Sequence, residues 1–354
     1  MAKTPEQLIS QTARHAVYLE GRKTAAANEI VELLQDVEER ILGRLARVDV
    51  TEFSRSRSEK LLTAIRGIME DAYSGNIEQA WRNQIIELGD YEAGFEQRSL
   101  SSVTVNYEYT LPTAAQIEAA AFTVPLSVQG PDKGKLLEPF YRDWTSKQID
   151  RVNGAIRAGI VQGDTTAQIV AGLRDIELPI NRRDMVAMVQ TGLAHASTQA
   201  RQATWNANSD IVRGVQAIAV LDSRTSAFCR SIDHQIFPIN QGPRSPFHVK
   251  CRTVMVAVLD ERFAILDQDA TRRARDADGL EYVDADLSYY GWLKTQPKPF
   301  IDSVIGPTRT KLLLNGGISA ERFAELGLNK NWKPMTIAQM RAVEPLAFQK
   351  AGLN

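Results

Sequence analysis

The sequence predicts a predominantly helical α+β protein, and three observations support that prediction. Apolar residues recur at steps of three and four through much of the first half, which is typical of amphipathic helices. Two short runs near the middle, residues 211–222 and 253–259, are rich in β-branched residues and indicate strands. Residues 223–252 between them have no pattern of regular structure and indicate one long loop. We therefore expect a helical N-terminal region, then a helix-rich module with a small antiparallel β element closed by a long ordered loop.

Composition limits the possible classes of protein. The 354 residues are 44% hydrophobic and 24% charged, which excludes wholesale disorder, and the length favours two or three folding units. A net charge of −1 removes the simplest argument for a nucleic-acid binder, although a local basic face stays possible. Two cysteines exclude a disulfide framework and fit a reducing compartment.

No export signal or membrane anchor is expected. The N-terminal residues MAKTPEQLISQTARHAV lack the apolar core of a secretion signal. The best candidate for a spanning segment, residues 119–128, is too short and contains Pro125. We expect a cytosolic product.

The N-terminal region is predicted to contain two long helices. One apolar stripe follows residues 30–48, and a second follows residues 53–69 with Asp49 or Thr51 as its N-cap and a stop at Gly75. These stripes could form the core of a helical bundle, or one of them could dock onto another subunit. The sequence leaves both open.

The next stretch contains a change of pattern and a connector. Residues 103–109 alternate apolar and polar side chains, which predicts a strand or an extended arm bounded by Pro112. Residues 129–135, QGPDKGK, have the composition of a loop. We place a domain boundary there and divide the chain into regions 1–130, 131–262 and 263–354.

Helical patterning returns after this connector. It covers residues 136–173, where Asp164 or Thr165 caps a helix start, and then residues 181–208. The strand-like runs and the long loop follow.

The long loop holds the candidate metal ligands. Both cysteines of the chain, Cys229 and Cys251, lie in it, and His248 stands three residues before Cys251. Thiolates and imidazole suit tetrahedral zinc, so these three residues are a candidate structural zinc site. A fourth ligand could come from His234, Asp233 or Asp222. Two small thiols packed under the loop, or a disulfide formed after lysis, would explain the same cysteines.

The loop is also locally basic. Its candidate residues for binding DNA or a protein partner are Arg224, Arg230, Arg244, Lys250 and Arg252. These side chains could meet phosphates or an acidic protein surface. They could equally hold the loop together by bonding to backbone carbonyls and nearby carboxylates.

The loop resembles the hallmark of the phage Mu protein F-like minor head proteins, also called phage head morphogenesis proteins. The matching positions are Asp222, Arg224, Thr225, Cys229, Asp233, Phe237, Pro238, Gly242, Pro243, Pro246, His248, Cys251 and Arg252. Residues 288–323 are similar to the C-terminal extension of such proteins, and the resemblance covers residues 136–341. The chain departs from the family at Ser226, where many members carry a further cysteine, and at Gln190 and Gly192, where many carry Arg and Glu. Without that cysteine, neither a four-thiolate nor a three-thiolate site can form.

The resemblance implies a non-enzymatic minor capsid protein of a tailed bacteriophage. Such a protein would act at the portal vertex in head assembly and DNA packaging, and in genome ejection. Its partners would be the portal protein, other head proteins and packaged double-stranded DNA. It would reside in the virion, inside the capsid or at the portal vertex, and in the host cytoplasm during assembly.

An enzyme is the rival class. Relatives of this module are sometimes fused to toxin domains of ADP-ribosyltransferase or nuclease type, and a DNA-binding factor is a further alternative. The residues after Val258 contain no His or Cys and are similar to the head-protein extension instead. The charged stretch 267–286 indicates an exposed helix or linker, and its Asp276-x-Asp278-Gly279 lacks the other positions of a calcium loop.

Overall fold

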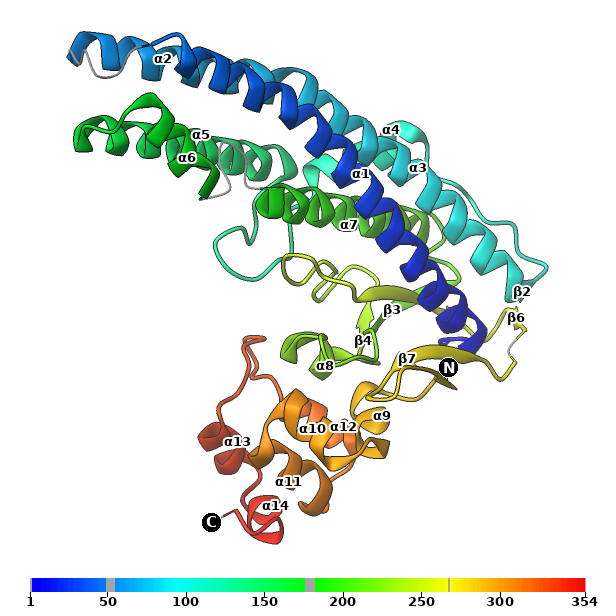
Figure 1. The fold of residues 1–354 in the computed structure, drawn as a ribbon. Coiled ribbons are helices and arrows are strands. Elements are labelled where there is room, and N and C mark those ends of the chain that lie inside the picture. The colour runs from blue at the N-terminus through cyan, green and yellow to red at the C-terminus, as the bar shows by residue number, and fades with distance from the viewer. Residues whose placement is uncertain (1, 49–54, 176–181, 267, 354) are drawn as a thin grey trace. The chain divides into compact units, whose positions relative to one another are not determined.

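The computed structural model describes residues 2–48, 55–175, 182–266 and 268–353 (Figure 1). The predicted fold class is confirmed, because the described chain is predominantly helical and its sheets are small and antiparallel. The chain forms two compact units. The sheet unit contains residues 1–20, 92–113 and 200–354, and the helical unit contains residues 21–91 and 114–199. Each compact unit gathers segments that are distant in the chain. The division into three consecutive regions stays a prediction.

The helical unit is built from long helices and one π-helical turn. Its elements are α1 (Glu6–Ala46), α2 (Arg55–Ala72), the π-turn η1 (Tyr73–Ile77), α3 (Glu78–Ser102), α4 (Ala114–Thr123), α5 (Leu137–Gln162), α6 (Thr166–Asp175) and α7 (Arg182–Ala207). Three of these helices, α1, α3 and α7, also contribute residues to the sheet unit. The connector at residues 129–135 is a loop, as predicted.

The apolar stripe of α1 forms part of the core of the helical unit. Ile30, Leu34, Val37, Ile41 and Leu45 are at most 1% exposed, because the chain's own helices cover them. Leu61, Leu62, Ile65 and Met69 of α2 are also buried. These buried residues support the bundle-core interpretation of both stripes, and docking of another subunit stays a prediction. The predicted caps of α2, Asp49 and Thr51, lie outside the described residues.

The helix α3 was not expected from the sequence. Its buried face carries Glu92 and Glu96 among apolar residues such as Trp81 and Ile85, and these charges interrupt the apolar stripe that a helix prediction needs. Both glutamates are paired in the sheet unit. Arg201 Nε donates to Glu96 Oε2 over 2.6 Å, and His15 Nε2 lies 2.5 Å from Glu92 Oε1.

The packing of α7 gives a physical reason for glycine at position 192. In α7 this glycine faces the Trp81 indole, and a Cβ placed on it would lie 3.0 Å from a ring carbon. A glutamate at this position would collide with a fully buried aromatic ring.

The sheet unit contains a four-stranded antiparallel sheet in the order β1-β5-β3-β4. The strands are β1 (Ala2–Lys3), β3 (Val212–Ile218), β4 (Ile236–Pro238) and β5 (Val254–Asp260). Pairing of β3 with β5 confirms the two strands predicted from β-branched residues. The intervening loop is more regular than expected, because it contains β4 and the helix α8 (Ala227–Ile232).

The strand or extended arm predicted for residues 103–109 is borne out. Its short strand β2 (Thr104–Val105) pairs with β6 (Ala264–Ile265), and the residues that follow are irregular. The charged stretch was expected to be an exposed helix or linker, and its described residues 268–286 correct that expectation. They form the hairpin of β7 (Thr271–Arg275) and β8 (Leu280–Asp284), in which Arg272 and Ala274 are buried and their neighbours are exposed.

Short helices complete the sheet unit. They are α9 (Tyr289–Thr295), α10 (Lys298–Ile305), α11 (Pro307–Asn315), α12 (Ala320–Glu325), α13 (Ile337–Val343) and α14 (Pro345–Lys350). They share an apolar core that includes Tyr289, Trp292, Phe323 and Phe348. None of the helices described is long and apolar enough to cross a membrane.

Candidate metal centre

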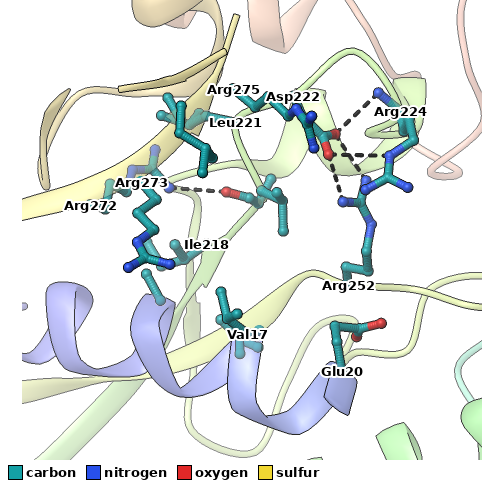
Figure 2. A pocket seen from close by; sticks show the side chains of 17 residues that line it. Val17, Glu20, Ile218, Leu221, Asp222, Arg224, Arg252, Arg272, Arg273 and Arg275 are labelled. Atoms are coloured by element: carbon teal, nitrogen blue, oxygen red, sulfur yellow. Dashed lines mark hydrogen bonds and ion pairs between the residues drawn. The ribbon is translucent and has the colours of Figure 1, made fainter. Parts of the chain in front are cut away.

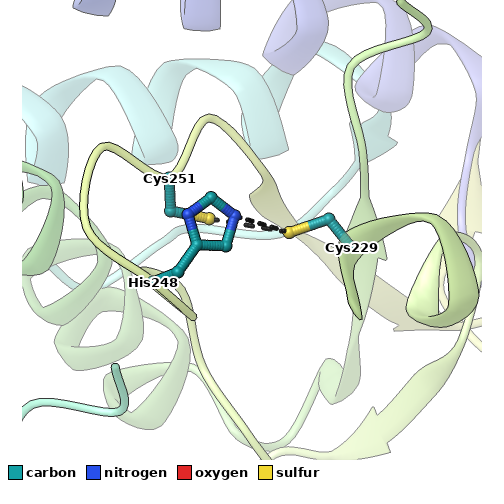
Figure 3. A group of neighbouring side chains, drawn as sticks. All are labelled: Cys229, His248 and Cys251. Carbon is teal, nitrogen blue, oxygen red and sulfur yellow. Dashed lines mark hydrogen bonds between the residues drawn. The ribbon is translucent and has the colours of Figure 1, made fainter. Parts of the chain in front are cut away.

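The two cysteines and His248 come together in the sheet unit, as the sequence predicted (Figure 3). Cys229 lies in the first turn of α8, where its backbone N–H donates to the N-cap hydroxyl of Ser226 over 3.2 Å. His248 and Cys251 lie in the turn that leads into β5, closed by a hydrogen bond from Cys251 N to His248 O. The side-chain ligand atoms of the three residues all lie within 4.8 Å of one another.

The distances fit a tetrahedral metal. Tetrahedral zinc with Zn–S of about 2.3 Å and Zn–N of about 2.0 Å places two thiolates about 3.8 Å apart, and a thiolate and an imidazole nitrogen about 3.5 Å apart. Here the Sγ atoms of Cys229 and Cys251 are 3.8 Å apart, and Cys229 Sγ is 3.3 Å from His248 Nε2. The two cysteines are free thiols, not a disulfide.

The imidazole of His248 is oriented for ligation. Its Nδ1 lies 2.9 Å from the carbonyl oxygen of Val249, which can only accept, so the proton is assigned to Nδ1. The lone pair of Nε2 then faces the thiols. A backbone carbonyl holding the far nitrogen is the usual support of a metal-bound histidine.

The two thiols differ in acidity. Burial raises the pKa of Cys251, but hydrogen bonds with Cys229 and His248 outweigh it and hold that pKa well below its usual range. The hydrogen bond with Cys251, together with burial, raises the pKa of Cys229. Burial lowers the pKa of His248, yet its hydrogen bond and charge interaction with Cys251 raise it overall. Cys251 is therefore the first thiolate of the pair.

A small cavity lies beside Cys229 and His248. This cavity has a volume of about 40 Å³, which is large enough for a water molecule. Its lining includes Cys229, His248, Ser226 and Thr253. None of the three residues proposed as a fourth ligand belongs to the cluster in the described structure. A water in the cavity would complete a Cys₂His site.

Asp222 is engaged elsewhere. Arg252 donates to both of its carboxylate oxygens, over 2.6 and 2.9 Å, and Thr225 Oγ1 donates over 3.0 Å. Burial raises the pKa of Asp222, but these bonds with Arg252 and Thr225 outweigh it and lower the pKa overall. The ion pair ties the end of β3 to the start of β5.

Asp233 joins four segments of the sheet unit. Its buried carboxylate accepts hydrogen bonds from the backbone N–H groups of Ala219 and Tyr289, both over 2.6 Å, from Arg272 over 3.2 Å, and from His234 Nδ1 over 3.1 Å. This role of Asp233 could not be predicted from the sequence, because its partner Arg272 lies on a hairpin that was expected to be a helix or linker.

Most of the basic residues proposed for binding hold the loop together instead. Arg244 is buried and donates to the carbonyl oxygens of Pro238, Ile239 and Gln241. Arg230 donates to the carbonyl oxygens of Thr225 and Val304. Together with Arg252 on Asp222, these contacts match the loop-holding interpretation. Only Arg224 and Lys250 of the five are exposed.

Comparisons with known proteins give no further identification. No protein-family model matches the chain, and no curated protein or solved structure matches it either.

Proposed function

We propose that this protein is a non-enzymatic minor head protein of a tailed bacteriophage, acting at the portal vertex in head assembly and DNA packaging. The main support is the ordered motif of residues 222–252, whose polar side chains form hydrogen bonds and ion pairs within the protein. Asp222, Asp233 and Arg244 each bond to other parts of the same fold. This use favours a rigid scaffold over an open catalytic site.

The same loop supports a structural metal. We propose that zinc binds Cys229, His248 and Cys251, with water at the fourth position. When bound, the metal would cross-link α8 to the turn before β5, which adds its binding free energy to that of folding. The support is the tetrahedral spacing of the ligand atoms and the orientation of His248.

A portal-docking surface must avoid the helical stripes that are buried in the core. A deletion of residues 30–69 would remove the core of the helical unit, so loss of portal binding in such a variant would report unfolding. The full-length chain is therefore the suitable reagent for co-purification with portal protein.

Mass spectrometry of purified virions tests the proposed function. We expect this chain at a few copies per particle, counted against the major capsid protein, with enrichment when portal vertices are isolated. Empty heads purified in parallel show whether the protein leaves the particle with the DNA. Particles that contain none of this chain would refute the assignment.

A DNA-binding factor without a virion role is less well supported, since three of its five candidate cations are used inside the loop. Filter binding to duplex DNA across a salt series separates the two proposals. A steep fall of affinity with salt would indicate phosphate-dominated contact and favour the DNA-binding factor.

A further inference from the structure

A second cavity of the sheet unit, here called the arginine pocket, lies between α1, the end of β3 and the β7–β8 hairpin (Figure 2). Its volume is about 420 Å³. Apolar lining comes from Val17 of α1, Leu221 after β3 and Leu280 of β8. None of these residues takes part in the candidate metal centre.

Charge is unevenly distributed around this pocket. Five arginines line it against two carboxylates, and the arginines are Arg224, Arg252, Arg272, Arg273 and Arg275. Arg273 lies on one side of the pocket, and Arg224 and Arg252 lie on the other (Figure 2). The pocket is therefore a cationic site with an apolar lining.

Three of these arginines are available to a ligand. Arg252 is held by Asp222, and Arg272 is buried against Asp233 and two backbone carbonyls. The Arg224 side chain is 74% exposed and lies 3.5 Å from an Asp222 oxygen that Arg252 already occupies.

The other two available arginines belong to the hairpin. Arg273 is exposed and bonds only to the Tyr282 hydroxyl and ring among the described residues. Arg275 is exposed and makes no ion pair within the described part of the chain.

The apolar lining of the pocket distinguishes between the classes of anionic ligand that could bind there. A DNA backbone offers phosphates but no apolar group to fill the space between Val17 and Leu280. A small molecule would usually bury most of its own surface, whereas Val17 and Leu280 remain 55% and 69% exposed. The apolar surface continues on the hairpin to Tyr282, which is 59% exposed. Such an open surface matches a peptide segment that runs across it.

We propose that the arginine pocket binds an acidic, apolar segment of another protein. One side chain of the size of leucine or phenylalanine enters the pocket, and neighbouring carboxylates pair with Arg224, Arg273 and Arg275. Bidentate pairing of carboxylates with guanidinium groups supplies both attraction and orientation. This inference is independent of the proposed role in the phage head.

Fluorescence anisotropy with the full-length protein tests the proposal. The probe is a fluorescein-labelled peptide, Glu-Asp-Leu-Phe-Asp-Glu. We expect saturable binding that Arg275→Glu weakens by about tenfold or more, because it reverses an exposed charge at the rim. The matched control is Arg157→Glu, the same change at an exposed arginine of the helical unit, which should leave binding unchanged.

The apolar contact is tested separately. We expect Leu280→Ser to weaken binding about fivefold and Leu280→Met to leave it nearly unchanged, since only the first removes apolar surface. A probe with alanines in place of Leu and Phe should bind at least tenfold more weakly. Equal binding of the two probes would mean simple charge attraction and would overturn the proposal.

Two further results would also overturn it. Displacement of the probe by a duplex oligonucleotide at equal charge concentration would identify a nucleic-acid site. A concentration-dependent dimer that Arg275→Glu abolishes, seen by analytical ultracentrifugation without peptide, would show that a second copy of this chain occupies the pocket. Unchanged thermal unfolding midpoints of the variants establish that the losses are not due to misfolding.

Discussion

Buried carboxylates stabilise the sheet unit at places where segments distant in the chain meet. Burial raises the pKa of Asp233, but the charges of Arg272 and His234 and several hydrogen bonds outweigh burial and lower this pKa to about 2. An uncompensated carboxylate in this place would be strongly destabilising, so its partners are as necessary as the acid itself. The neighbouring Asp222 works in the same manner with Arg252.

Asp233→Asn should lower the free energy of unfolding by about 3 kcal/mol. The amide removes the charge that compensates buried Arg272 and turns an NH₂ group towards one of two backbone N–H donors. Urea denaturation measures the change. Asp278→Asn, at the exposed hairpin tip, is the matched control and should shift stability by less than about 0.5 kcal/mol. Equal effects of the two substitutions would contradict the central role of Asp233.

At the scale of elements, the boundary between α5 and α6 follows local sequence rules, whereas at Gly75, where a helix end was expected, the chain only kinks and continues through η1 into α3. Helix α5 stops at Gly163, which adopts φ of 80° and donates back to the carbonyl oxygens of Gly159 and Ile160. A β-carbon at this position would meet no other atom within 4 Å, so only the backbone conformation demands glycine. The next helix begins after Thr165, whose hydroxyl accepts from Gln168 N, as the cap prediction proposed.

Gly163→Ala should therefore lower the free energy of unfolding by about 1 kcal/mol, the cost of a left-handed alanine. Gly154→Ala, in the exposed interior of the same helix, should raise it by roughly 0.5–1 kcal/mol, because alanine is the better helix former. Denaturation curves of the two variants are compared with the parent. Shifts of the same sign would show that the conformation of Gly163 is not what limits the helix.

The loop between β3 and β5 is the element on which the metal proposal rests. Protein purified from zinc-supplemented medium should contain one zinc per chain, and His248→Ala should reduce this content at least tenfold. Lys250→Asn is the matched control, because Lys250 is an exposed residue of the same loop outside the cluster, and asparagine tolerates its left-handed backbone. Cobalt substitution should add thiolate-to-metal absorption. Wild-type protein without stoichiometric zinc would leave the two cysteines as packed thiols.

Sequence patterns predicted these elements unevenly, for physical reasons. The continuous apolar stripe from residue 30 onward predicted the second half of α1, but no helix was assigned to its first half, which begins at Glu6. Helix α3 was missed because it hides Glu92 and Glu96 on its buried face. The hairpin β7–β8 was missed because its arginines alternate between burial and solvent, which resembles an exposed charged segment. Cys229, His248 and Cys251 could be grouped because few residue types bind zinc. The arginine pocket could not be foreseen, since its lining comes from segments far apart in the chain.

At the scale of the molecule, the two units respond to acid through different groups. His195 in the helical unit is buried beside the carbonyl oxygen of Ala121, and burial lowers its pKa to about 4 although hydrogen bonds to backbone oppose the shift. The folded state keeps this histidine neutral, while the unfolded chain takes up a proton near pH 6.5. Stability from this group is therefore complete above pH 6.5 and is lost as pH falls towards 4.

We expect the helical unit to lose up to about 3 kcal/mol over that window. Stability from Asp233 in the sheet unit should persist until the pH falls below its ordinary pKa of about 4, since its folded pKa is depressed. Hydrogen exchange read by mass spectrometry at pH 7 and pH 5, corrected for intrinsic rates, resolves the two units. His195→Gln should flatten the response of the helical unit. Loss of protection in the sheet unit first would contradict this order.

The discontinuous make-up of the units has a consequence during translation. Every segment of the helical unit precedes residue 200, whereas strand β1 at residues 2–3 must wait for its partner β5 at residues 254–260. Because chain emerges from the ribosome in order, the helical unit can complete its core while the first residues of the protein still lack their sheet. Strand β1 is thus made before β5 and paired late. A nascent chain arrested before β5 emerges should be protected from protease in its helical unit and cleavable at its N-terminus.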